Sequence, residues 1–304
     1  MCYCSFPSLH ASTAMKHEFI QEHRSKWRVS RMCRALGTSE AGYYAKLNRK
    51  PSQRALEEAA ILIVMRKIHE EHHRTYGGAR MQAALGAENL ACGQSRVRRL
   101  MRENGLYTVH RKKHGPYPKE KAETQPQENL LAREFKPEMP NQSWVGDITY
   151  IRAQMGWTYL ATVIDLFNKE VVGYALSRKP SADLVVQALQ QAVRRREPPE
   201  GLIFHSDRGV QYRSRKHRAC LDQNGIQGSM SQKGCPYDNA CAESFFATLK
   251  KEWIYRHSYA SLEEVDSSLF EYIELFYNRK RMHTSLGNLS PRTFLEKHLA
   301  ARSA

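Results

Sequence analysis

The residues after Ser143 change from helical to strand-like periodicity, and this change most limits the folds that the chain can adopt. Three β-rich runs follow one another closely, as in an antiparallel meander, at residues 143–153, 156–168 and 170–178. Helix-like and strand-like segments then alternate, with helices expected at 182–196, 213–224 and 240–255 and strands at 201–206 and 226–231. This order predicts an α/β domain in which a mixed sheet is flanked by helices.

The preceding part of the chain, residues 16–110, shows helical spacing of its apolar side chains. Gly37 interrupts the stretch Trp27–Leu47, and Thr38 or Ser39 can cap the helix that follows. Helix, glycine turn and helix is the plan of the DNA-binding helix-turn-helix, although a plain helical hairpin has the same pattern. Three further helices are expected, at about residues 55–71, 81–85 and 94–106.

The charge is strongly positive and unevenly spread. The net charge is +16, and residues 1–140 carry 25 Lys and Arg against 14 Asp and Glu, whereas residues 141–304 carry 22 against 17. Such a balance favours a polyanionic partner, most often nucleic acid. Candidate contacts to the DNA backbone are the basic side chains of the helix at 94–106 and of the Pro- and Lys-rich segment after it, namely Arg96, Arg98, Arg99, Arg102, Arg111, Lys112 and Lys113. A merely solvated basic surface is the alternative.

Acidic side chains mark the candidate site in the second half. Aspartate is scarce, with seven in the chain and none before Asp147. Asp147 lies in the first expected strand, Asp207 ends the strand at 201–206, and Glu243 lies near the start of the helix at 240–255. Carboxylates are costly to bury unless they are paired or bind a metal, and Mg²⁺ prefers such oxygen ligands. Two ions ~3.5–4 Å apart can serve phosphodiester displacement.

The spacing of these acids, with 35 residues between Asp207 and Glu243, resembles the D-D-35-E arrangement of DDE transposases and retroviral-type integrases. An ordered set of segments extends this pattern over about residues 16–299: "MCRALGTSEAGYYA", "RTYGGAR", "RVRRLMRENGL", "WVGDITYI", "VIDLFNKEVVGYAL", "FHSDRGVQY", "SMSQKGCPYDNACAESFFATLKKE" and "YNRKRMHTSLGNLSPRTF". With these segments the chain resembles, more closely, the second-frame (OrfB) transposase of the IS-three family of bacterial insertion sequences.

This resemblance implies a ribonuclease-H-like integrase catalytic core over residues 141–304. A helical helix-turn-helix region at 16–106 and a basic linker at 107–140 precede the core. Residues 1–15 are an unassigned extension, so that Met15 is an alternative start to Met1. The implied cofactor is Mg²⁺ or Mn²⁺, two ions per site, held by Asp147, Asp207 and Glu243.

The same resemblance implies cleavage and strand transfer at the element ends. The implied partners are the terminal inverted repeats, target DNA, further copies of the chain, and an OrfA protein, separate or fused by frameshifting. Two rival hypotheses stay open: a nuclease of this fold without strand transfer, and a non-catalytic DNA-binding regulator. No apolar run approaches the ~20 residues of a membrane helix, and we expect a cytoplasmic protein at the bacterial nucleoid.

Residues close to the acids are candidates for supporting roles. Lys250 follows Glu243 by seven residues, nearly two helical turns, so both share a helix face, and the resemblance implies that Lys250 contacts DNA. His205 precedes Asp207 by two residues, so alternation places both on one strand face; it either contacts DNA or the acids or is a packed histidine. Gly209 is expected to permit a tight turn.

Three further polar residues are expected to act mainly in the fold. Asp238 and Asn239 precede the helix at 240–255 and are favoured N-cap types, so we expect capping here in preference to metal binding. Asp165 ends a β-run before a turn and is expected to be structural.

Overall fold

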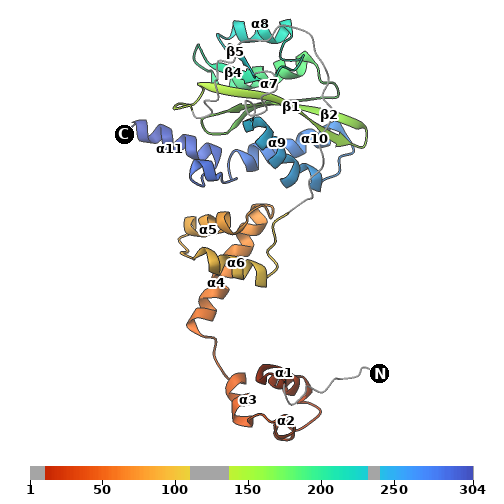
Figure 1. Cartoon of the computed structure of the whole chain (residues 1–304), viewed down its shortest axis with the longest axis vertical. Coiled ribbons are helices and arrows are strands. Elements are labelled where there is room, and N and C mark those ends of the chain that lie inside the picture. The colour runs from red at the N-terminus through yellow and green to blue at the C-terminus, as the bar shows by residue number, and fades with distance from the viewer. Residues whose placement is uncertain (1–10, 110–136, 232–239, 304) are drawn as a thin grey trace. The chain divides into compact units, whose positions relative to one another are not determined.

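The computed structural model describes residues 11–109, 137–231 and 240–303 (Figure 1). By its internal contacts the chain divides into two compact units, Met1–Ile63 and Val64–Ala304, and the division falls inside helix α4 (Gln53–Glu71). Most of the predicted linker at 107–140 lies outside the described residues. The functional boundaries expected from the sequence therefore remain predictions.

The first unit holds the expected helix–glycine–helix arrangement. Its helices are α1 (Thr13–His23), α2 (Val29–Ala35) and α3 (Glu40–Leu47). Gly37 has φ of 60°, the left-handed backbone that glycine adopts without strain, and the Ser39 hydroxyl caps α3 by accepting the Gly42 N–H at 3.2 Å. The buried side chains of this unit are Phe19, Ile20, Met32, Cys33, Leu36 and Tyr43.

The second unit opens with the remainder of α4, followed by α5 (Gly78–Ala87) and α6 (Gln94–Glu103). The apolar side chains that the spacing predicted to face inward on α6 are all buried, namely Val97, Leu100 and Met101. The apolar face predicted for this helix is thus confirmed, and of its arginines Arg98 and Arg102 are exposed.

The sheet of the second unit is mixed, as predicted. Its strands are β1 (Ser143–Ala153), β2 (Gly156–Asp165), β3 (Val171–Ser177), β4 (Ile203–Ser206) and β5 (Gln227–Met230). Within the described residues the strand order is β3-β2-β1-β4-β5. The first three strands form the antiparallel meander, whereas β4 runs parallel to both β1 and β5. Central β1 therefore pairs with an antiparallel strand on one side and a parallel strand on the other.

Helices cover both faces of this sheet (Figure 1). On one face, α7 (Ala182–Arg196) and α8 (Arg215–Gln223) pack against a core that includes Trp144 and Phe204. On the other face, α9 (Ala240–Glu252), η2 (Ile254–Arg256), α10 (Leu262–Phe270) and the π-helical turn η3 (Glu271–Tyr277) share a second core with Val145 and Ile151. A short 3-10 turn, η4 (Thr284–Leu286), and the helix α11 (Pro291–Ser303) end the described chain. No helix among the described residues is long and apolar enough to cross a bilayer.

A buried ionic cluster fixes the end of α9. Both carboxylate oxygens of Glu252 bind the guanidinium of Arg281, at 2.7 and 2.8 Å, and the Tyr272 hydroxyl donates to the same carboxylate at 3.2 Å. Arg80 lies 3.8 Å from Glu252. Tyr76, which is fully buried, donates its hydroxyl to the Lys280 carbonyl and accepts the Met282 N–H. These bonds tie α9 to the segments before and after it.

We expect Glu252→Gln to lower the free energy of unfolding by about 3–5 kcal/mol, because it leaves the charge of Arg281 buried without its partner. The matched control is Glu296→Gln, whose ion pair with Arg292 is 3.4 Å long and has side chains 65% and 52% exposed. That change should cost about 0.5 kcal/mol or less. Urea denaturation measures both, and equal losses would contradict an anchoring role for Glu252.

Candidate active site

Two acids meet because of the pairing of β1 with β4. The parallel register ends where Gly146 lies opposite Ser206, so Asp147 and Asp207 both follow the last paired position on adjacent strands. A Cβ atom at Gly146 would lie 2.3 Å from the Phe204 ring, so glycine leaves room for this ring to pack over β1. The two acids are separated by 59 residues in the sequence, yet they lie on adjacent strands, whose backbones are ~4.8 Å apart.

The two carboxylates border one cleft of about 210 Å³, which Tyr150, Gln211 and Tyr212 also line. Asp147 accepts the N–H of Ile148 at 2.8 Å, and Asp207 accepts the N–H of Gly209 at 2.9 Å. A Cβ atom at residue 209 would lie 2.9 Å from the Asp207 carboxylate, so glycine there makes room for the turn, as the sequence predicted.

Burial and neighbouring acids disfavour the charged form of Asp147. Burial raises the pKa of Asp147 to about 8, with further contributions from the negative charges of Asp207 and Glu243, against the opposing effects of the Ile148 N–H and of Lys250. Partial desolvation also raises the pKa of Asp207, and the Gly209 N–H opposes this shift. Both shifts favour the neutral carboxylic acid over the carboxylate.

The third predicted acid, Glu243, lies in the first turn of α9 and is exposed, and it acts on Asp147 through its charge. Over the described ranges, no three His, Cys, Asp or Glu side chains are drawn together closely enough to hold a metal ion as they stand. The donor chemistry nevertheless fits a hard cation, because the available groups are carboxylate oxygens that repel one another. The buried Tyr212 hydroxyl, which lines the same cleft, has no hydrogen-bond partner among the described residues.

Lys250, on α9, contacts the ring of Tyr150, which lines the cleft. Its ammonium nitrogen is 4.3 Å from the centre of the Tyr150 ring, within the range of a cation–π interaction. Burial lowers the pKa of Lys250, while the nearby charge of Asp147 raises it. The sequence predicted that Lys250 shares a helix face with Glu243. It did not predict the role of Tyr150, which could have been found only by its position three residues after Asp147 in the same strand.

His205 is fully buried, so of the two roles that the sequence left open for it, the structure shows a packed histidine. Its two ring nitrogens lie 2.9 and 3.2 Å from the hydroxyls of Ser229 and Ser231, so the ring offers no surface to DNA. Asp165 is likewise fully buried and accepts the backbone N–H groups of Asn141 and Phe167 at 3.0 and 2.9 Å. These bonds agree with its expected structural role, whereas Asp238 and Asn239 lie outside the described residues.

The basic side chains of α6 differ in their exposure to solvent, and therefore in how readily they can contact DNA. Arg98 and Arg102 are exposed, Arg96 is half-buried, and Arg99 binds Glu103 at 2.8 Å within the helix. The remaining basic candidates lie outside the described residues, namely Arg111, Lys112 and Lys113.

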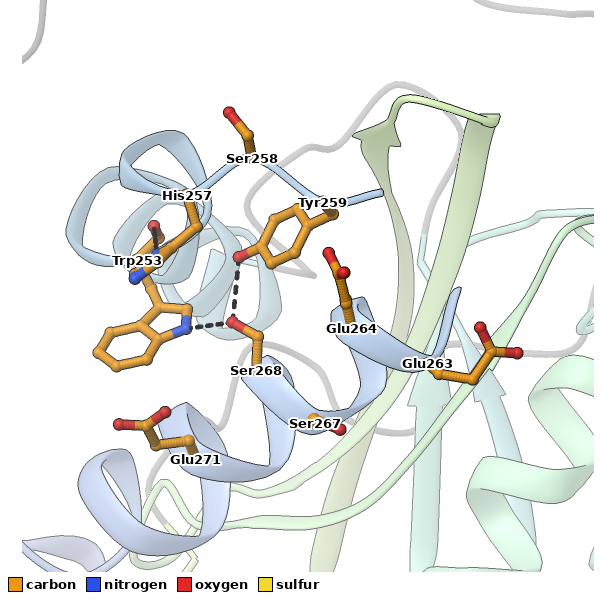
Figure 2. A pocket seen from close by; sticks show the side chains of 9 residues that line it. All are labelled: Trp253, His257, Ser258, Tyr259, Glu263, Glu264, Ser267, Ser268 and Glu271. Atoms are coloured by element: carbon orange, nitrogen blue, oxygen red, sulfur yellow. Dashed lines mark hydrogen bonds between the residues drawn. The ribbon is translucent and has the colours of Figure 1, made fainter. Parts of the chain in front are cut away.

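A second cavity, of about 470 Å³, lies beside the end of α9 and is acidic (Figure 2). Its lining residues are Trp253, His257, Ser258, Tyr259, Glu263, Glu264, Ser267, Ser268 and Glu271. The Ser268 hydroxyl accepts the indole N–H of Trp253 at 2.7 Å and lies 3.1 Å from the Tyr259 hydroxyl. The three glutamates would repel phosphate, so this cavity is not a candidate for DNA binding.

The chain is similar to known integrase cores and insertion-sequence transposases. The integrase core domain matches residues 137–236 and 224–291 in two models, and an HTH-like domain matches residues 55–114. The transposase InsF for insertion sequence IS3A of Escherichia coli K12 is 38% identical, covering 94% of this chain and 100% of the relative. The uncharacterized 31 kDa protein of insertion element IS600 from Shigella sonnei is 39% identical over 88% of this chain and 98% of its own length. The chain belongs to the IS3 family of insertion-sequence transposases.

Solved structures similar to this transposase include a simian T-cell lymphotropic virus intasome, with a TM-score of 0.46, 16% identity and coverage of 75% of this chain and 73% of that one. The HTLV-2 integrase catalytic core domain in complex with magnesium gives a TM-score of 0.42 at 16% identity, covering 52% of this chain and 99% of that one. The HTH-like match of the transposase spans α4 to α6, while its helix–glycine–helix at Trp27–Leu47 lies before the match.

The raised pKa of Asp147 predicts that this residue's own contribution to the stability of the metal-free transposase falls as pH rises from about 4 to about 8. Across this window the native state keeps the Asp147 proton that the unfolded state has released, so this contribution to the free energy of unfolding falls by up to about 1.4 kcal/mol per pH unit. Asp147→Asn should remove this negative contribution from the slope of unfolding free energy against pH, measured by urea denaturation with a chelator present. Asp183→Asn, which removes an exposed carboxylate on α7, should leave the slope unchanged. A slope unaltered by Asp147→Asn would refute the shift.

Proposed function

We propose that this transposase cuts phosphodiester bonds at the ends of its insertion sequence and joins the resulting 3′-OH to another DNA phosphate. The single observation that carries the proposal is the placement of Asp147 and Asp207 at one position of adjacent parallel strands, bordering one cleft. The charge of Glu243 on α9 acts on the same carboxylate.

Asp147, Asp207 and Glu243 would hold the divalent cations, Mg²⁺ or Mn²⁺, two per site. When bound, these ions supply electrostatic stabilisation of the attacking and leaving oxygens. The exposed position of Glu243 leaves its side chain free to turn toward the two aspartates when a cation is present. In the first step water attacks the phosphorus at the element end, the bond from phosphorus to the 3′ oxygen breaks, and that oxygen leaves as a 3′-OH. In the second step this 3′-OH attacks a phosphorus of another DNA strand and displaces the 3′ oxygen bound there.

The chain's own cations would hold the DNA. Lys250, whose charge is felt by Asp147, would bind a phosphate next to the cleaved one, and the exposed side chains of Arg98 and Arg102 would contact the backbone further away. The substrates would be the terminal inverted repeats and target DNA, brought together by several copies of the chain at the bacterial nucleoid. An OrfA protein, separate or fused, would complete the assembly.

The proposed chemistry is tested by single-turnover cleavage of a labelled element end in Mg²⁺. Asp147→Asn, Asp207→Asn and Glu243→Gln should each reduce the rate about 100-fold or more, because the metal sites contribute several kcal/mol to the transition state. Asp222→Asn, an exposed aspartate on α8, is the matched control and should cut normally. Cut ends that are never joined would support a nuclease, while full activity of the Asp207 variant would refute the site.

The contribution of α6 is tested by the salt dependence of end binding. The double change Arg98→Ala with Arg102→Ala should reduce the slope of log affinity against log salt by roughly 2 units, because each phosphate contact contributes about 0.9. Arg292→Ala, an exposed arginine on α11, is the control. Gel shifts at several salt concentrations measure the slope, and an unchanged slope would remove α6 from the DNA interface.

A further inference from the structure

The hairpin of β1 and β2 extends past the candidate active site. The pairing of β1 with β4 stops at Gly146, but β1 continues to Ala153 with β2 alone beside it. Its end carries apolar and basic side chains to the surface: Trp157 is 47% and Met155 64% exposed, and Arg152 is exposed as well. Trp157 and Met155 thus expose apolar surface at the end of the hairpin, next to the basic side chain of Arg152.

The exposed tryptophan belongs to an aromatic pair with cations at both ends. The rings of Tyr150 and Trp157 meet edge to face, with centroids 5.1 Å apart and planes at 89°. Lys250 lies 4.3 Å from the Tyr150 ring centre, and the guanidinium of Arg152 lies 5.8 Å from that of Trp157. Tyr150 also lines the cleft that Asp147 borders, so the pair continues directly from the acids to the hairpin surface.

Aromatic rings interleaved with cations are the surface that proteins use to hold unpaired nucleotides. The rings stack on bases, worth about 1–3 kcal/mol per base, while the cations bind the backbone phosphates. Bases inside a duplex are already stacked and paired, so such a surface selects a nucleotide that has left the helix. The positive charges of Arg152 and Lys250 match this ligand and would repel a basic partner.

We propose that Tyr150 and Trp157 form a stacking surface for an unpaired base of the element end. The proposal rests on the proposed function, which places the cleaved phosphate at Asp147 and Asp207. Tyr150 is three residues along β1 from Asp147, or ~10 Å at ~3.3 Å per residue. A step in duplex DNA is ~3.4 Å and an unpaired nucleotide spans more, so the stacked base lies at most about three nucleotides from the cut.

The alternative is that the pair only stabilises the hairpin. Arg152 pairs with Trp157 and Tyr150 with Tyr159, so Tyr150 and Trp157 are diagonal neighbours, and such pairs stabilise sheets. The variant Trp157→Val separates the two roles, because valine favours strands yet has no ring on which a base can stack. Trp157→Phe keeps a ring and should restore most of the lost function.

The experiment pairs each variant of the full chain with abasic DNA. On intact element ends, Trp157→Val should slow single-turnover cleavage about 10-fold, as expected for one lost stacking contact. On an end made abasic at the stacked position, one of the three nearest the cut, the same variant should cut as fast as the wild type. Met155→Ala, an exposed residue of the same hairpin, should show no such coupling, and urea denaturation reports any loss of fold.

An equal slowing by Trp157→Val on intact DNA and on all three abasic ends would overturn the proposal. A wild-type protein that fails to cut intact ends would instead overturn the proposed function. The stacking surface would then be tested by DNA-binding measurements alone. In that case Trp157→Val should bind an unpaired strand of about 10 nucleotides about 10-fold more weakly while its affinity for duplex is kept. Equal affinities for the unpaired strand would refute the stacking surface.

Discussion

The parallel pairing of β1 with β4 is the interaction on which the site of this transposase depends. It brings residues almost sixty positions apart to neighbouring strands, and it ends one residue before each aspartate. Because the backbone groups are satisfied up to that point, the carboxylates emerge at an edge where β1 continues and β4 does not. The same early end of β4 leaves the far part of β1 open on one side, where Lys250 reaches Tyr150.

Helix α9 supplies the other half of the site, and its far end is held by the buried pair of Glu252 and Arg281. Charged groups at such depth are stable only with complete partners, so this end of the helix has one well-defined position. Glu243, at the opposite end, is exposed. The helix thus combines an anchored C-terminal end with an exposed acidic residue at its first turn, which is compatible with the metal-ligand role proposed for Glu243.

Local periodicity in the sequence predicted most of the helices and strands of the fold. The strand expected at 143–153 and the helix expected at 182–196 have those bounds in the structure, because alternation and the 3.6-residue repeat are read from neighbouring side chains. The strand expected at 201–206 is shorter, starting at Ile203, and the expected helix at 240–255 ends at Glu252. Ends of elements depend on packing against distant segments, such as the core around Trp253, which periodicity does not report.

By itself the sequence determined the order of helices and strands, the scarcity of aspartate and the spacing of the three acids, since these are properties of the chain read in order. Only the tertiary structure decided which side chains meet. It buried His205 against two serines from β5 and its end, although alternation had left its role open, and it set Lys250 over Tyr150. Both outcomes follow from pairing and packing between elements far apart in the chain, where sequence spacing carries no distance information.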